Sequence, residues 1–130
     1  KNKGNYTFSS FDNLPNEVNG NMEIISEDTK ITDPLPQKIK SLCINCPNLK
    51  SLKGIVFPQK MESLYINCQK LKSLEGINDS CTSIGYLSIN VDNLEDLTGL
   101  PDSVEKLSLN YCNFQNLKGC PMHLKILWLY

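Results

Sequence analysis

Two neighbouring stretches decide the fold of this chain: residues 39–55, IKSLCINCPNLKSLKGI, and residues 61–77, MESLYINCQKLKSLEGI. They align without a gap, and the pattern continues as IGYLSINVDNLEDLTGL at 84–100 and VEKLSLNYCNFQNLKGC at 104–120. A fifth unit begins as LKILWLY at 124–130. Repetition at a regular period indicates an architecture in which each unit packs against its neighbours.

One leucine recurs in every unit and is used here as the anchor of each coil: Leu42, Leu64, Leu87, Leu107 and Leu127. Successive anchors are 22, 23, 20 and 20 residues apart. An apolar residue follows each anchor two positions later, which is the alternation of a β-strand with one buried face. The next apolar residues follow seven and ten positions after the anchor, so we expect the chain to leave the strand and return through an irregular or 3₁₀ segment.

Glycine recurs at one corner of each coil, at Gly54, Gly76, Gly99 and Gly119, and proline follows in three of these four units. Glycine permits backbone angles that other residues avoid, and proline cannot continue a hydrogen-bonded ladder. A single coil cannot bury its own Leu/Ile face, so the coils must stack. The repeat therefore predicts a parallel sheet with one short strand per coil and the recurrent leucines in the core.

The units resemble leucine-rich repeats of the short, irregular kind found in bacteriophage and bacterial proteins. The motifs that carry the resemblance are LKSLKGI at 49–55, LKSLEGI at 71–77 and the junction GLPDSVEKLSLN at 99–110. It covers residues 35–130 and implies a leucine-rich-repeat solenoid of about five coils, the last of them incomplete. Plant immune-receptor repeats are also similar, but they usually place two residues between the Ile and the Cys where this chain has one. The resemblance implies little about function, because the repeat serves many purposes.

Residues 1–34 follow the period only loosely, and we expect them to form an N-terminal cap with one degenerate repeat. Met22 and Ile24 are the candidate strand pair of that repeat, Ile31 belongs to its return, and NYTFSSF at 5–11 is an additional strand. Terminal repeats of a solenoid are usually atypical, because one of their faces meets water.

Composition and charge exclude several classes of function. The 130 residues fit one domain, and 13 basic against 14 acidic residues leave a net charge of −1 with the signs interleaved. This balance supplies no basic stripe for nucleic acid or for anionic lipid. No apolar run approaches the roughly 20 residues of a membrane span, and the first residues lack the apolar stretch of a signal peptide. We expect a soluble protein, cytoplasmic or virion-associated, that binds neither nucleic acid nor membrane.

The chemistry-bearing residues predict neither catalysis nor a metal site. Cys43 and Cys46 form a C-x-x-C motif, but a second such motif is missing, and a single histidine, His123, cannot complete a Cys2His2 site. Cys120 lies close to His123 in sequence, but the turn that holds them recurs in each coil as a structural corner. We therefore predict a protein that is not an enzyme, with no cofactor and no metal, whose six cysteines are thiols.

The residues that flank the inward-facing leucines predict an outer sheet face, the surface that leucine-rich repeat proteins commonly use for binding. Tyr65 and Tyr86 lie on neighbouring coils of this face, and Ile126, Trp128 and Tyr130 lie on the last coil. Tyr and Trp supply large contact area at low entropy cost, although aromatic residues also suit strands for packing reasons alone. We predict that these five residues bind a partner, either a host or phage protein or a second copy through the C-terminal edge.

Asparagine recurs three residues after the anchor, at Asn45, Asn67, Asn90 and Asn110. Stacked carboxamides on parallel strands can hydrogen-bond along the stack, so we predict a structural ladder. Together the sequence favours a non-catalytic, phage-derived module for protein–protein interaction. The alternative is a structural or assembly component of a virion or larger complex.

Overall fold

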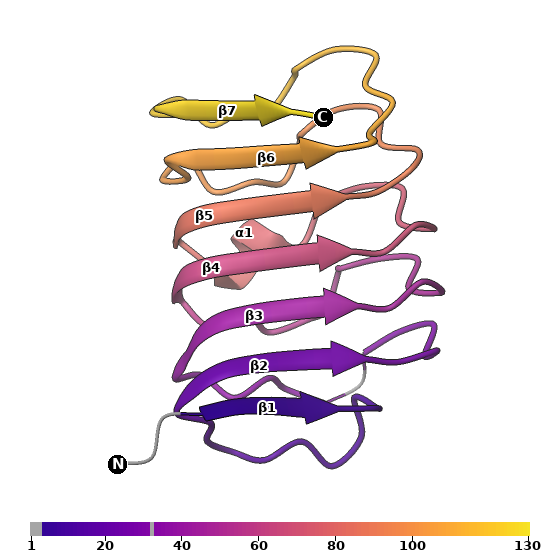
Figure 1. Cartoon of the computed structure of the whole chain (residues 1–130), viewed down its shortest axis with the longest axis vertical. Helices are drawn as coiled ribbons and strands as arrows, with labels where there is room; N and C mark the ends of the chain where they lie inside the picture. The colour runs from indigo at the N-terminus through magenta and orange to yellow at the C-terminus, as the bar shows by residue number, and fades with distance from the viewer. Residues whose placement is uncertain (1–3, 32) are drawn as a thin grey trace.

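The computed structural model describes residues 4–31 and 33–130 as a β-solenoid with one seven-stranded parallel sheet (Figure 1). The strands lie along the sheet in chain order, so each strand pairs with the strands of the preceding and following coils. They are β1 (Gly4–Phe8), β2 (Gly20–Ile25), β3 (Ile39–Asn45), β4 (Lys60–Asn67), β5 (Ser83–Asn90), β6 (Lys106–Asn110) and β7 (Ile126–Leu129). The parallel solenoid predicted from the repeat is confirmed.

The strand register follows the repeat. Leu42 pairs with Leu64, and the same lane continues through the remaining anchors, Leu87, Leu107 and Leu127. The apolar residues two positions later form a second lane, in which isoleucine or leucine stacks from coil to coil. Because side chains alternate across a strand, both lanes point into the solenoid.

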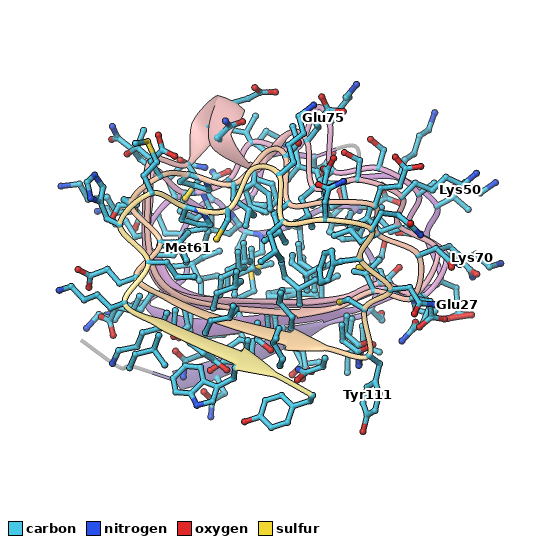
Figure 2. The ribbon with its side chains drawn as sticks, turned by 90° about the horizontal axis from the view of Figure 1, so that it is seen from above. Glu27, Lys50, Met61, Lys70, Glu75 and Tyr111 are labelled. Atoms are coloured by element: carbon cyan, nitrogen blue, oxygen red, sulfur yellow. The ribbon has the colours of Figure 1, made fainter. Side chains whose placement is uncertain are left out.

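Apolar side chains fill the interior of the stacked coils, and charged side chains such as Glu27, Lys50 and Lys70 point outward (Figure 2). The return segments complete the core with leucines that are fully buried in the central coils: Leu49, Leu52, Leu71, Leu74 and Leu97. One return contains the short helix α1 (Ile77–Ser80), whose Ile77 is buried. In the described ranges, no helix has the length and apolar character that crossing a membrane requires.

The segment before residue 35 contributes two regular strands, β1 and β2, and a separate capping element is not shown. Met22 and Ile24 pair with Leu42 and Ile44 and are buried, as the predicted strand pair requires. Tyr6 continues the anchor lane onto β1, opposite Met22. The solenoid therefore starts earlier than the repeat suggested.

The recurrent glycines stand at sharp corners with a left-handed backbone, from φ 84° at Gly119 to φ 115° at Gly76. At Gly76 and Gly99 a Cβ atom would lie 2.5 Å from the carbonyl oxygen of Leu52 or Leu74 on the preceding coil. These corners therefore require glycine for two reasons, the backbone conformation and the close approach of the coil beneath.

The last coil departs from the predicted core. Leu127 and Leu129 were expected to complete it, but they are 37% and 65% exposed, and Leu117 is 50% exposed. Their equivalents in the central coils are buried because a further coil covers them, whereas no described coil covers β7. The inward direction of these side chains was predicted correctly, but their burial was not.

Tyr111 also departs from the pattern of the preceding coils. It lies one residue after the recurrent asparagine, where those coils have the buried residues Cys46, Cys68 and Val91. Tyr111 instead has a positive φ of 57° and a side chain that is 76% exposed, projecting from the end of β6 (Figure 2). The left-handed residue turns the chain, so that the next residue, Cys112, packs against the core in its place.

Candidate functional site

The outer face of the sheet includes two lanes of side chains that flank the anchors. The first outer lane contains the residue before each anchor: Asn5, Asn21, Ser41, Ser63, Tyr86, Lys106 and Ile126. The second outer lane contains the residue after each anchor: Thr7, Glu23, Cys43, Tyr65, Ser88, Ser108 and Trp128. Since the anchors point into the core, the residues of these two lanes point to the opposite, outer face of the sheet.

Three predicted binding residues meet on this face and form what we call the aromatic ridge: Tyr65, Tyr86 and Trp128. The ring centroids of Tyr65 and Tyr86 lie 5.7 Å apart, and those of Tyr86 and Trp128 lie 6.0 Å apart, both edge to face. This geometry is the favourable one for aromatic pairs. The sequence placed these residues in two separate groups, and the structure joins them into one surface across β4 to β7.

A small residue on β6 permits the contact between Tyr86 and Trp128. Tyr86 lies on β5 and Trp128 on β7. On β6, the strand between them, Ser108 is the neighbour of Trp128 in the second outer lane. Ser108 points to the outer face, yet it is only 3% exposed. The two rings therefore meet above β6 and cover this serine, whose hydroxyl donates to Asn110 Oδ1 at 3.3 Å.

The other two predicted binding residues lie beside the aromatic ridge and make no ring contact with it. Ile126 is 40% exposed and pairs in register with Lys106. Tyr130 is 71% exposed, and its backbone N–H donates to Leu109 O at 3.0 Å while its carbonyl accepts from Tyr111 N at 3.2 Å. The structure thus fixes the backbone of Tyr130 and leaves its side chain free for contact.

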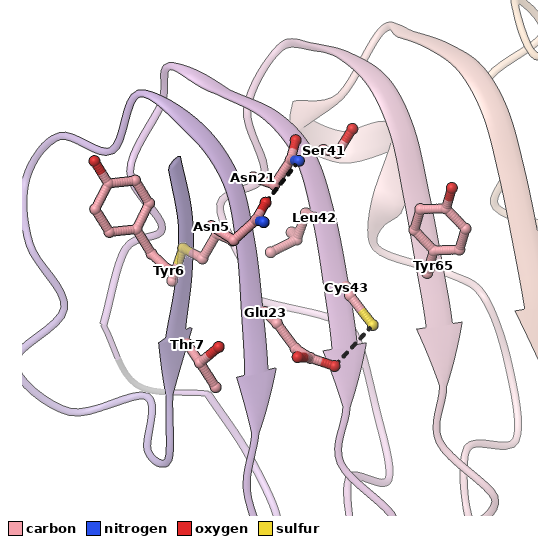
Figure 3. Close-up of a pocket in the computed structure, with 10 residues that line it drawn as sticks. Asn5, Tyr6, Thr7, Asn21, Glu23, Ser41, Leu42, Cys43 and Tyr65 are labelled. Atoms are coloured by element: carbon pink, nitrogen blue, oxygen red, sulfur yellow. Dashed lines mark hydrogen bonds between the residues drawn. The ribbon is translucent and has the colours of Figure 1, made fainter. Parts of the chain in front are cut away.

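A shallow depression of about 430 Å³ lies on the same face at the N-terminal side of the ridge (Figure 3). We call it the polar depression; its outward-facing residues are Asn5, Thr7, Asn21, Glu23, Ser41, Cys43 and Tyr65. Asn21 Nδ2 donates to Asn5 Oδ1 at 2.9 Å, and Cys43 Sγ donates to Glu23 Oε2 at 3.7 Å. Tyr65 closes the depression on one side and begins the ridge on the other, so the two features are continuous.

Sequence reasoning missed the polar depression, because it assigned residues 1–34 to a cap. The alternation of Asn5 and Thr7 around Tyr6, and of Asn21 and Glu23 around Met22, was the available signal. It marks the outer lanes of two additional strands.

Charge is sparse on the outer face. Of the fourteen residues in the two outer lanes, Glu23 is acidic and Lys106 is basic, and the rest are neutral. The ion pairs among the described residues, for example Lys125 Nζ with Glu105 Oε2 at 3.0 Å, involve neither of these two side chains. Two residues of the aromatic ridge, Tyr65 and Tyr86, therefore lie between one negative and one positive side chain, whereas Trp128 lies on β7, beyond Lys106.

The recurrent asparagines lie at the ends of their strands, all half-buried: Asn45, Asn67, Asn90 and Asn110. One direct hydrogen bond joins two of these side-chain amides: Asn67 Nδ2 donates to Asn45 Oδ1 at 3.4 Å. Asn110 Nδ2 instead donates to Ser88 Oγ at 3.4 Å, on the outer face. The predicted ladder is therefore interrupted, and its two ends have different hydrogen-bond partners.

All six cysteines are free thiols. Three of them aim their Sγ atoms at an isoleucine carbonyl on the preceding strand at 3.7 Å, as Cys46 does toward Ile24 and Cys68 toward Ile44. Burial raises the pKa of Cys46 to about 12 and that of Cys68 to about 11. Burial, together with the nearby Glu23, raises the pKa of Cys43 to about 11. These three thiols are therefore protonated and weakly nucleophilic at neutral pH.

The remaining residues considered for chemistry are dispersed. Cys120 is half-buried and His123 is exposed, and in residues 4–31 and 33–130 no hydrogen bond joins their side chains. Across the same residues, no three His, Cys, Asp or Glu side chains gather closely enough to hold a metal ion. The predicted binding residues, by contrast, gather on the outer face.

Comparisons of this chain with protein-family models, with curated proteins and with solved structures gave no match.

Proposed function

We propose that this protein is a non-catalytic interaction module of the leucine-rich-repeat type, phage-derived, which binds a host or phage protein through its outer sheet face. The observation that carries the proposal is the aromatic ridge. Tyr65, Tyr86 and Trp128 expose ring surface on three strands, β4, β5 and β7, at positions where the fold has no need of a large apolar side chain.

The rigidity of the aromatic ridge supports this assignment. Its rings are held edge to face on a hydrogen-bonded sheet, so little side-chain freedom remains to be lost on binding. Tyr and Trp are also the residues that most often dominate the energy of protein interfaces. Polar groups of the adjoining depression then supply a rim of hydrogen-bond donors and acceptors.

The test is partner retention by matched aromatic variants. Tyr86→Ala removes the central ring, and we expect at least a tenfold loss of affinity for a protein captured from host lysate and then purified. Tyr111→Ala is the control, because this tyrosine is 76% exposed but lies outside both outer lanes. Equal binding by the two variants, with unchanged melting temperatures, would show that the interface lies elsewhere.

A second candidate function is a structural or assembly role, and the open edge of β7 favours it. This strand pairs with β6 on one side, and its other side has no partner among the described strands. Its side chains are all exposed, including Leu129 at 65% and Trp128 at 37%. Unpaired backbone groups beside apolar side chains are a template for another strand.

Light scattering after size-exclusion chromatography separates the two candidates. A monomer over the micromolar range favours the binding module, and stable self-assembly favours the structural role. For the structural role, we expect the double variant Trp128→Ala with Tyr130→Ala to remain folded and to lose association. In a longer chain whose additional residues cover β7, we expect no assembly even without a substitution, because the strand edge is then occupied.

A further inference from the structure

The two charged residues of the outer lanes lie on opposite sides of the tyrosine pair of the aromatic ridge, and Trp128 lies beyond Lys106 on β7. Glu23 projects from β2 and Lys106 from β6, and Tyr65 and Tyr86 lie on the strands between them. The other ten residues of the two outer lanes are uncharged as well. A partner that crosses the sheet from β2 to β6 therefore meets a negative side chain, then two tyrosine rings, then a positive side chain.

We propose that the outer face binds an extended peptide segment with a basic side chain over Glu23, apolar side chains on the ridge, and an acidic side chain over Lys106. This inference rests on the proposed function and specifies its partner. A peptide with opposite charges at its two ends is complementary to Glu23 and Lys106.

The spacing of the face matches an extended peptide that crosses the strands. Adjacent strands are about 4.8 Å apart, so the four steps from β2 to β6 span about 19 Å. An extended chain advances about 3.3 Å per residue, so six steps along a peptide cover the same distance. Alternate side chains of that peptide face the sheet about 6.6 Å apart. This interval is close to the 5.7 Å between the ring centroids of Tyr65 and Tyr86, the two rings within this span.

The expected motif is therefore seven residues long: basic, any, apolar, any, apolar, any, acidic, read in either chain direction. At the basic end, the peptide cation meets the Glu23 carboxylate and the amide oxygens around it in the polar depression (Figure 3). Tyr65, which borders the depression, adds the face of an aromatic ring on which an Arg or Lys stem can lie.

A charge-swap selection tests the motif. A library of random seven-residue peptides displayed on a carrier is selected on the wild-type protein, on Glu23→Lys and on Glu62→Lys. The control residue Glu62 is exposed on β4 and lies outside both outer lanes. We expect wild type and Glu62→Lys to enrich the same basic-to-acidic motif, and Glu23→Lys to enrich peptides with an acidic residue at both ends.

One enriched peptide is then synthesised and titrated against the variants. Glu23→Lys should weaken it by at least tenfold, because attraction becomes repulsion, and exchanging the peptide's basic residue for an acidic one should restore binding. Glu23→Gln, which keeps the side-chain shape, should give a smaller loss in the same direction.

The outcomes separate the two proposals. The charge motif is overturned if the enriched peptides lose affinity for Tyr86→Ala but show no charge preference, or if Glu23→Lys leaves their affinity unchanged. Either result still supports the interaction surface. Peptides that bind equally well to Tyr86→Ala overturn the proposed function too. A selection that enriches no peptide rejects an extended segment as the occupant.

Discussion

The corner glycines differ from one another in what lies beneath them. Gly54 and Gly99 both have a left-handed backbone, with φ of 86° and 109°. A Cβ on Gly54 would meet nothing within 4 Å, whereas a Cβ on Gly99 would lie 2.5 Å from Leu74 O. The same substitution at these two positions therefore separates the cost of conformation from the cost of stacking.

We expect Gly54→Ala to lower the free energy of unfolding by about 1–2 kcal/mol, the usual penalty of a side chain in the left-handed region. Gly99→Ala adds a clash with the backbone of the preceding coil, which cannot move without disturbing its own strand, so its loss should be larger. Urea denaturation of both variants measures the difference. Equal losses would mean that the coils adjust their spacing at the corner.

The buried thiols make stability depend on alkaline pH. Cys46 and Cys68 have native pKa values of about 12 and about 11, against an ordinary value of 9.0 that applies to the unfolded chain. Between pH 9 and these native pKa values, the two thiols keep their protons in the native state but lose them in the unfolded state. The free energy of unfolding is therefore insensitive to these thiols below pH 9 and falls as the pH rises from about 9 toward 11.

Cys46→Val is the matched variant, because Val91 occupies the equivalent buried position one coil beyond Cys68. We expect the decline in stability above pH 9 to be shallower in Cys46→Val than in wild type, measured by denaturant unfolding at several pH values. An identical slope in both proteins would mean that the Cys46 thiol does not carry this dependence.

At the scale of the strand, neighbours on both sides decide how much a leucine contributes. Leu64 on β4 is fully buried between β3 and β5, whereas Leu129 on β7 is 65% exposed. We expect Leu64→Ala to cost about 2–5 kcal/mol, through lost transfer energy and the cavity that remains. Leu129→Ala should cost less than about 1 kcal/mol, because most of its side chain already meets solvent. Thermal melts test both, and comparable losses would indicate that β7 is covered in solution.

The sequence predicted the strands of the central coils well, because there the repeat and the period of the strand coincide. Met22 and Ile24 were recognised in β2 although their repeat is degenerate. The same segment was predicted to be a cap that contains one degenerate repeat and an additional strand at 5–11, and the structure has β1 (Gly4–Phe8) in that stretch. The sheet shows that alternation around Tyr6 and Met22 is enough for a regular strand when a neighbouring coil supplies the pairing partner.

The candidate site was only partly predictable. Outward position follows from alternation, so Tyr65, Tyr86 and Trp128 were placed on one face from the sequence alone. Their contact was not predictable, because Tyr86 and Trp128 lie two strands apart and meet only over the small side chain of Ser108. Burial at the last coil was also missed, since a repeat pattern gives direction but cannot state whether a following coil is present.

The strictly sequential order of the sheet bears on how the molecule forms during synthesis. Each strand pairs only with the strand that the ribosome made immediately before it and the one made immediately after. A nascent chain can therefore add one coil at a time to a growing stack, because no strand needs a pairing partner that is synthesised much later. The exposed edge moves forward with each addition, so at every intermediate length the apolar surface in need of shielding is about that of a single coil.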